Sequence, residues 1–510
     1  MTRSVLWPLL AVALGSALAC ASTPAATPVP VAAPASTPAG PVSDPEEYQD
    51  HGISAAAGEA YFAHLGGGDP YATGIAYPVW LALVEGFPAE LGGDVAHFAG
   101  KFGLLVDAPQ GPLPVGLHVT TDPNTRVGFV VMNCQLCHAE RLRLPGGDRV
   151  VSGLGSTHVR VHAYDAALVH VARDPSFTTE NVLALANRAA RTHELAWPEG
   201  TRVPIVRASV TALIERAEAR GLDVERLAQG LPGRVATIES FALSMHVHPA
   251  VGATIGWAKV PDVRGFPWRD TLSWDGVGTG SPVALAAEAD FAFGARPEWF
   301  ETHRHIATDL YLYLEHFDRA LPYPGRIDAP LAERGRSAFD ATCARCHGFY
   351  SPDGPQPRVR YRERVVPAAL IGTDEARLDA VTPAFLEAAR AVPLARGMTT
   401  VAPTGGYVPP VLLDVWARGT YGHVGQWPSI DVMATKPEER PRRFAIDPDA
   451  PYDLEHLGLS WKKLGDGGAT PAQGYVYDAG SQGYGVQGHR FLSDLPADDR
   501  RAVLEYLKTL

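Results

Sequence analysis

The stretch NCQLCH, residues 133–138, contains two cysteines separated by two residues, with a histidine directly after the second cysteine. The run TCARCH at residues 342–347 repeats this spacing. In a covalent haem anchor the two thioethers and the axial histidine share one helical turn, so this site uses all three residues. The repeat therefore predicts two covalently bound haem c groups. Their expected anchors are Cys134, Cys137, Cys343 and Cys346, and the expected iron ligands are His138 and His347.

Two other sites use the same cysteine spacing. The pairs could be two redox dithiols, or they could combine into one four-cysteine zinc site. An exported protein would tend to oxidise bare pairs to disulfides, and a zinc site would leave the two following histidines without a role. Covalent haem accounts for all six residues.

The first 46 residues indicate where the protein works. Arg3 precedes an apolar run from Val5 to Ala19, which predicts an export signal over residues 1–19. Two peptidases could cut at the end of this run: Ala17-Leu18-Ala19 suits ordinary small-residue cleavage, and Cys20 stands where a bacterial lipoprotein carries its lipid-accepting cysteine, which is the interpretation we favour. Residues 20–46 are rich in Pro, Ala and Thr and are expected to form an extended tether. We therefore expect a periplasmic or cell-surface protein, tethered to a membrane only through a lipid on Cys20.

Composition limits the remaining choices. The chain has 510 residues with 46% hydrophobic content, enough for more than one folded core. Its 44 prolines and 51 glycines favour a structure rich in loops. The net charge of −12 argues against binding to nucleic acid. We expect a mainly α fold with two cytochrome-c-like haem domains, at residues 47–325 and 326–510, with long irregular loops and a helical insertion.

The second haem domain has the clearer helical pattern. A stripe at every fourth residue leads into its motif, and a second apolar face lies in the closing segment LPADDRRAVLEYLKTL. We predict that these two helices pack against each other, with a glycine allowing close approach. The stripe consists of Leu331, Gly335, Phe339 and Cys343, and the closing face of Val503, Tyr506, Leu507 and Leu510.

The first haem domain is less regular. The apolar run VGFVVM leads into the motif as a strand-like segment, without a preceding helix. Residues 176–246 contain amphipathic helical patterns and are interpreted as the insertion. After them, GFPWRDTLSWDGVGTGS reads as a loop that carries Trp268 and Trp274.

Several segments of the chain resemble one family. These are residues 330–347, VVPAALIGTDEARLDAVTP (365–383), GGYVPPVLLDVWARGTYGHVGQWPSI (405–430) and VQGHRFLSDLPADDRRAVLEYLKTL (486–510). They resemble the di-haem cytochrome c peroxidase superfamily, and within it the branch of rubber-oxygenase-like di-haem c-type cytochromes. Two places differ from that branch: the usual Trp-Ala-Thr-Ala-Pro-Tyr string reads Trp-Ala-Arg-Gly-Thr-Tyr from Trp416, and Ser273 replaces a frequent His before Trp-Asp-Gly.

The sixth position of each iron decides the chemistry, because an iron with two protein ligands mainly carries electrons. For the C-terminal haem the resemblance implies His489, from a Gly-His pair near the chain end; His423 and Met398 are the alternatives. For the N-terminal haem, three histidines follow the motif, and their spacing singles out none. The rival interpretation is an open distal face, bordered by apolar side chains. The histidines are His158, His162 and His170, and the distal-face candidates are Phe266, Trp268 and Trp274.

An alternating run, PRVRYRERV, follows the second motif. In a strand it would place the guanidinium groups of Arg358, Arg360, Arg362 and Arg364 on one face. These could bind haem propionates, since an arginine fork matches a carboxylate. Alternatively, they are a solvated strand edge that charge protects from aggregation.

The pattern as a whole predicts an exported di-haem c-type cytochrome that transfers electrons. The resemblance implies an enzyme that reduces peroxide, or uses dioxygen on an organic substrate, at the N-terminal haem, with the C-terminal haem relaying electrons. The alternative is a pure electron carrier in which both irons have six ligands. Expected partners are a redox protein or small electron donor, together with a small-molecule or peroxide substrate. Trp or Tyr side chains between the domains are expected to assist electron transfer.

Overall fold

The computed structural model describes residues 48–65, 73–107, 112–221, 223–245, 247, 252–280, 297–351, 358–392, 399–465 and 474–510. The predicted export signal and tether, including Cys20, lie outside these residues, and so does Met398. Residues from Asp44 to Leu510 form one compact unit, to which all statements below refer. Among the described helices, none is both long enough and apolar enough to cross a bilayer.

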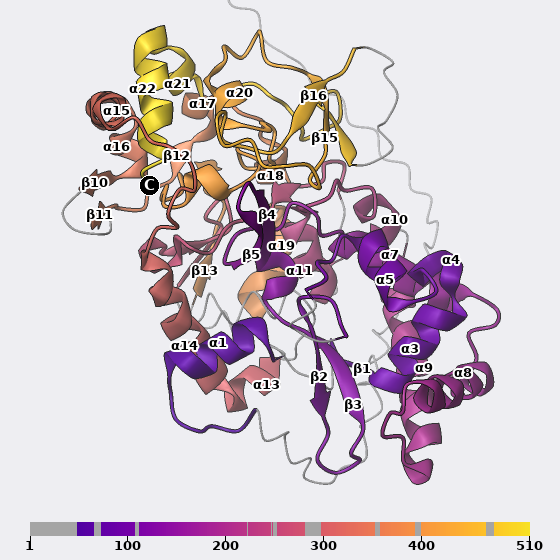
Figure 1. The fold of residues 1–510 in the computed structure, drawn as a ribbon. Coiled ribbons are helices and arrows are strands. Elements are labelled where there is room, and N and C mark those ends of the chain that lie inside the picture. Colours follow the sequence, from indigo (N-terminus) through magenta and orange to yellow (C-terminus); the bar gives the residue numbers. More distant parts are fainter. Residues whose placement is uncertain are drawn as a thin grey trace, which may run out of the picture. The chain divides into compact units, whose positions relative to one another are not determined.

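The N-terminal part of the unit combines short helices with small antiparallel sheets (Figure 1). The run VGFVVM forms a strand, β3, at the centre of a sheet with the order β1-β3-β2, and it leads directly into the first motif. The elements are α1 (Ala55–Ala63), β1 (Ile75–Ala76), α3 (Tyr77–Gly86), α4 (Pro88–Leu91), α5 (Val95–Phe102), β2 (Leu117–Thr121), β3 (Gly128–Met132), α6 (Gln135–His138), β4 (Ala139–Leu144), β5 (Gly147–Ser152) and α7 (Val161–Arg173).

The helices expected between residues 176 and 246 are present. Thr178 caps the first of them by accepting a hydrogen bond from the Asn181 amide, and an apolar face that includes Val182 and Ala186 is buried. The elements of the middle region are α8 (Thr179–Thr192), α9 (Glu199–Arg220), α10 (Asp223–Leu227), β6 (Arg234–Val235), α11 (Thr237–Ser244), β7 (Ala258–Lys259), η3 (Phe266–Trp268), β8 (Thr271–Leu272), β9 (Gly278–Gly280), α13 (Pro297–Thr302), α14 (Arg304–Leu314) and η4 (Glu315–Asp318).

The predicted pair of C-terminal helices is confirmed. Helices α15 and α22 lie side by side (Figure 1), and the rings of Phe339 and Tyr506 are 5.3 Å apart. A Cβ on Gly335 would lie 1.8 Å from the Ala502 carbonyl oxygen, so only glycine permits this approach.

The remaining elements complete the chain around these two helices. They are α15 (Ala329–Thr342), α16 (Ala344–His347), β10 (Phe349–Ser351), β11 (Arg358–Arg360), β12 (Val366–Pro367), α17 (Ala368–Ile371), α18 (Ala376–Asp379), α19 (Pro383–Ala391), β13 (Thr399–Val401), β14 (Gly406–Tyr407), η6 (Val415–Ala417), α20 (Ile430–Ala434), β15 (Arg443–Ile446), β16 (Trp461–Lys463), β17 (Tyr475–Asp478), α21 (Arg490–Ser493) and α22 (Ala497–Leu507).

The prediction of a mainly α fold is wrong. The described residues contain several two- and three-stranded antiparallel sheets, so the fold mixes α and β structure. One sheet joins strands that are far apart in sequence: β9 pairs with β8 and also with β13, with Val401 opposite Gly278. Strands of two to six residues leave little periodic signal, and pairing across such distances leaves none in a local window.

Candidate functional site

The two motifs fold into the same one-turn structure. In the first, the His138 amide donates to the Cys134 carbonyl at 2.9 Å; in the second, the His347 amide donates to the Cys343 carbonyl at 3.0 Å. Each turn therefore places two cysteines and a histidine side by side, as the spacing predicts. We call the turn at 134–138 with its surroundings the N-terminal site, and the turn at 343–347 with its surroundings the C-terminal site.

Each histidine is oriented by a proline carbonyl. The Nδ1 of His138 lies 3.0 Å from the carbonyl oxygen of Pro261, and the Nδ1 of His347 lies 2.9 Å from that of Pro410. A carbonyl oxygen only accepts, so Nδ1 carries the proton and donates in both cases. This fixes the tautomer and leaves Nε2 of each ring as the nitrogen that can bind a metal ion.

Each turn lines its own cavity. Cys134, Cys137 and His138 face a cavity of about 480 Å³. The C-terminal turn faces a smaller cavity of about 120 Å³. Burial lowers the pKa of His138 to about 4 and also lowers that of His347, which keeps both imidazoles neutral, as metal ligation requires.

The surroundings of the cysteines argue against the two alternatives left open by the sequence. Neither pair forms a disulfide. Burial raises the pKa of Cys137 and of Cys343 to about 12, so neither of these two thiols is activated as a thiolate at neutral pH. The described residues contain no cluster of three or more His, Cys, Asp or Glu side chains suited to hold a metal ion, so the two pairs do not assemble one zinc site.

In the C-terminal site a second histidine faces the first. The ring centroids of His347 and His489 are 6.2 Å apart, and both rings line the same cavity. Two imidazoles that share one metal ion, with metal–nitrogen bonds of about 2 Å, have their ring centroids about 6 Å apart. Burial lowers the pKa of His489 to about 3, and within the described chain its Nδ1 has no hydrogen-bond partner.

The backbone holds His489 in an uncommon conformation. Its φ is +49°, in the left-handed region, and it follows Gly488 at +86°. The His489 amide donates to the Ile371 carbonyl at 2.8 Å, and Arg440 donates to the Gly488 carbonyl at 2.7 Å. Non-glycine residues in this region are often found at functional sites, where the surrounding structure holds them in place.

The alternative ligand His423 also lines the C-terminal cavity. Its ring stacks on Tyr407 with centroids 4.4 Å apart, and burial lowers its pKa to about 3. Among the described residues, the ring of His489 lies against that of His347, whereas the ring of His423 lies against Tyr407. The structure therefore favours His489 as the residue that faces His347.

The three N-terminal candidate histidines do not face His138 in this way. His158 forms an ion pair with Glu140 at 3.0 Å, and His170 lies 2.6 Å from Glu225. His162 lines the cavity, but its Nε2 accepts a hydrogen bond from the Ala236 amide at 2.9 Å. Burial lowers the pKa of His162 to about 4. Each of the three rings is therefore already engaged elsewhere through at least one of its nitrogens.

The apolar candidates for the N-terminal distal face separate into two groups. Phe266 and Trp274 line the N-terminal cavity. Trp268 is not among the described residues that line it and packs against the large C-terminal core instead. Trp274 also lines the C-terminal cavity, so this residue belongs to the walls of both cavities.

Trp274 is firmly held in this position. Its indole N–H donates to the Lys259 carbonyl at 2.8 Å. The guanidinium of Arg377 binds both sequence neighbours, Ser273 at 2.9 Å and Asp275 at 2.9 Å, and the Arg377 and Asp275 side chains are almost fully buried. Ser273 thus helps to anchor the loop that carries Trp274.

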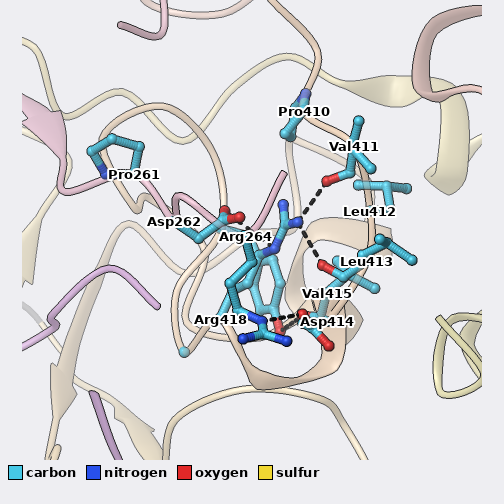
Figure 2. Close-up of polar contacts among 12 residues, drawn as sticks. Pro261, Asp262, Arg264, Pro410, Val411, Leu412, Leu413, Asp414, Val415 and Arg418 are labelled. Atoms are coloured by element: carbon cyan, nitrogen blue, oxygen red, sulfur yellow. Dashed lines mark hydrogen bonds and ion pairs between the residues drawn. The ribbon is translucent and has the colours of Figure 1, made fainter. Parts of the chain in front are cut away.

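A buried ion pair connects the two proline loops. Asp262, next to Pro261, lies 3.3 Å from Arg418. The same guanidinium donates to the Val411 and Leu413 carbonyls at 2.5 and 2.7 Å, in the loop that begins with Pro410 (Figure 2). Beside it, Arg264 pairs with Asp414. The sequence predicted neither these arginines nor the prolines, because the contacts join segments that lie more than 60 residues apart.

Two arginines that the sequence did not suggest line the N-terminal cavity. Arg216 and Arg220 lie one turn apart on α9, and both pair with Asp165, at 2.7 and 3.1 Å. Their i, i+4 spacing in the sequence was the one signal that could have placed both side chains on the same face of a helix. The alternating arginines Arg358, Arg360, Arg362 and Arg364 are instead all exposed and line neither cavity. This agrees with the solvated strand edge and not with propionate binding.

Comparison with known proteins adds no assignment: no family model matches the chain, and no curated protein matches it significantly.

Proposed function

We propose that the chain is an exported di-haem c-type cytochrome with one haem c in each site. The repeated turn carries the proposal: two cysteines and a histidine line a cavity, and a carbonyl fixes the histidine through Nδ1. This arrangement suits two thioether bonds and an axial iron ligand. Cys134, Cys137 and His138 would hold one group, and Cys343, Cys346 and His347 the other. Export and lipidation of Cys20 are part of the proposal.

The two sites differ in a way that suggests a division of labour. His489 faces His347, which favours two protein ligands and an electron-transfer role for the C-terminal site. The described candidates around His138 already have other partners, which favours an open position at the N-terminal site. When bound, haem with an open position supplies redox chemistry toward peroxide or dioxygen. We propose peroxide reduction, or dioxygen-dependent oxidation of an organic substrate, at the N-terminal site.

The protein's own residues would then position the groups and the electron path. Trp274, held by Lys259 and the Arg377 clamp, lies between the cavities. Arg216 and Arg220 are cations in the wall of the N-terminal cavity that could bind propionate carboxylates. The apolar side chain of Phe266 helps to exclude water from the same cavity.

A pure electron carrier is the second candidate. The presence of His162 in the wall of the N-terminal cavity favours it, because this ring would bind iron if it released the Ala236 amide. In that case both irons would have two protein ligands.

Two measurements on the purified, exported protein test the proposal. A pyridine haemochrome assay with intact-mass analysis should give two covalent haems per chain. A chain without covalent haem would refute the proposal. Electron paramagnetic resonance of the oxidised and half-reduced protein should then show a high-spin ferric signal that changes on adding peroxide. Only low-spin ferric signals, unchanged by added ligands in both states, would establish the electron carrier instead.

A further inference from the structure

A band of positive charge lies beside the C-terminal site. The side chains of Arg358, Arg360, Arg362 and Arg364, which we call the arginine ridge, are all exposed. The residues between them point inward: Val359 packs on the core, Tyr361 donates to the Pro409 carbonyl at 2.5 Å, and Glu363 pairs with Arg269 at 2.5 Å. In the described ranges no carboxylate forms an ion pair with the ridge, so its charge faces solvent.

The ridge is tied to the loop that orients His347. Pro409, which accepts the Tyr361 hydrogen bond, directly precedes Pro410, which accepts from the histidine ring. Strand β11 pairs with β10, which begins two residues after His347, with Arg360 opposite Phe349. Arg345, inside the motif, is also exposed and lines the C-terminal cavity. The positive surface therefore reaches the wall of this site.

Exposed apolar side chains accompany the charge. Phe349, Val365 and Leu370 are 41%, 36% and 54% exposed; Phe349 stands opposite Arg360 in the β10–β11 pair, and Val365 directly follows Arg364. The Arg360 guanidinium lies over the Phe349 ring at 5.6 Å. Leu370 precedes Ile371, which lines the C-terminal cavity. A small apolar patch bordered by charge is typical of transient protein contacts, where area stays small and charge guides the encounter.

We infer that the ridge with Phe349, Val365 and Leu370 is a docking surface for an acidic electron-transfer protein. The inference rests on the proposed function and adds the partner's charge. The chain as a whole carries −12, so a positive face orients an acidic partner toward this site, while the rest of the surface repels it. The partner would give up one electron and become oxidised, and this electron would reduce, from ferric to ferrous, the haem that Cys343, Cys346 and His347 would hold.

The test uses the full holoprotein and reduced plant-type [2Fe–2S] ferredoxin, a small acidic one-electron donor. Stopped-flow absorbance follows haem reduction at several salt concentrations. The ridge variant R360E/R362E/R364E is compared with R188E/R191E/R207E, which changes the net charge equally at exposed arginines on α8 and α9. At low salt the ridge variant should lose about tenfold or more in second-order rate, and the salt dependence should flatten. The α8–α9 variant should lose much less.

Equal losses in the two variants would overturn the inference, because net charge alone would then explain the effect. Dithionite should reduce the ridge variant at the wild-type rate, which would show that its haem site is intact although its reaction with ferredoxin is slow. Missing haem in the wild-type protein would instead refute the proposed function. A membrane role is the competing outcome: loss of binding to phosphatidylglycerol vesicles in the ridge variant, with an unchanged ferredoxin rate, would also overturn the inference. F349S should slow reduction at every salt concentration.

Discussion

The guanidinium of Arg418 lies 3.3 Å from the carboxylate of Asp262, and both side chains are buried. The pair joins the loop that accepts from His138 to the loop that accepts from His347. A buried pair of this kind positions both histidines at once.

In the proposed di-haem protein, replacing Arg418 should change both the free energy of unfolding and the potentials of the haems. R418Q leaves Asp262 buried without its partner and removes donors from two carbonyls, at a cost of about 3 kcal/mol in the free energy of unfolding. Loss of the cation favours ferric iron, so the potential of the C-terminal haem should fall by roughly 30–60 mV. Denaturant unfolding and spectroelectrochemical titration measure the two effects.

The matched variant D262N should act on the other site. Loss of the carboxylate near His138 disfavours ferric iron, so the N-terminal potential should rise while the C-terminal potential changes less. If each variant changed the two haem potentials equally, the idea that Arg418 acts mainly on the C-terminal haem and Asp262 mainly on the N-terminal haem would be contradicted.

In the proposed di-haem protein, His489 should control the spin state of the haem at the C-terminal site. H489A removes the ring that faces His347. The low-spin ferric signal of this haem should therefore convert to a high-spin signal in electron paramagnetic resonance. H423A is the matched control, since its ring lines the same cavity but stacks on Tyr407. Conversion by H423A and not by H489A would identify His423 as the ligand.

Trp274 should govern electron transfer between the sites. W274F keeps an aromatic ring but loses the indole that reaches both cavities, so inter-haem transfer after pulse reduction should slow roughly tenfold, a change of about 1.4 kcal/mol in barrier. W268F, at a tryptophan that packs on the core, is the control. Identical rates in both variants would mean that the indole is not on the path.

The close crossing of α15 and α22 predicts a size limit at Gly335. G335A would place a methyl group against the Ala502 carbonyl and should destabilise the fold by about 1–3 kcal/mol. G100A in α5 has no atom within 4 Å of the new Cβ and should be stabilising by about 0.5–1 kcal/mol. Thermal unfolding of both variants measures the contrast, and a stabilised G335A would show that the helices can separate at little cost.

A pH effect is expected at His170. The hydrogen bond to Glu225 raises its pKa above the ordinary value, so the interaction is fully present below pH about 6.5 and is lost as pH rises through the raised pKa. E225Q should bring the His170 pKa back toward its ordinary value in an NMR titration. Because the pair is partly exposed, the stabilisation that E225Q removes, measured below pH about 6.5, should stay under about 1 kcal/mol. E199Q, an exposed change on α9, should leave this titration unchanged.

Local spacing carried most of what the sequence predicted correctly. The C-x-x-C-H turns and the Gly335 stripe each depend on residues within one or two helical turns, where periodicity is informative. His489 came from the resemblance, because nothing in its own neighbourhood marks it as facing His347. The Pro261 and Pro410 contacts join positions 123 and 63 residues apart, beyond any local pattern. Short strands such as β6 and β14 were not predicted, because their pairing partners also lie far away in the sequence.

The large C-terminal core has a consequence for how this protein can be divided. Leu142, Val151 and Leu154, which flank the first motif, are buried in the same core as Tyr477 and Val503 near the chain end. Pro410 belongs to the wall of both cavities. A gene fragment that encodes either motif alone would therefore expose part of the other half's interior, and recombination could not exchange one half without the other. The two motifs should be inherited as a single unit.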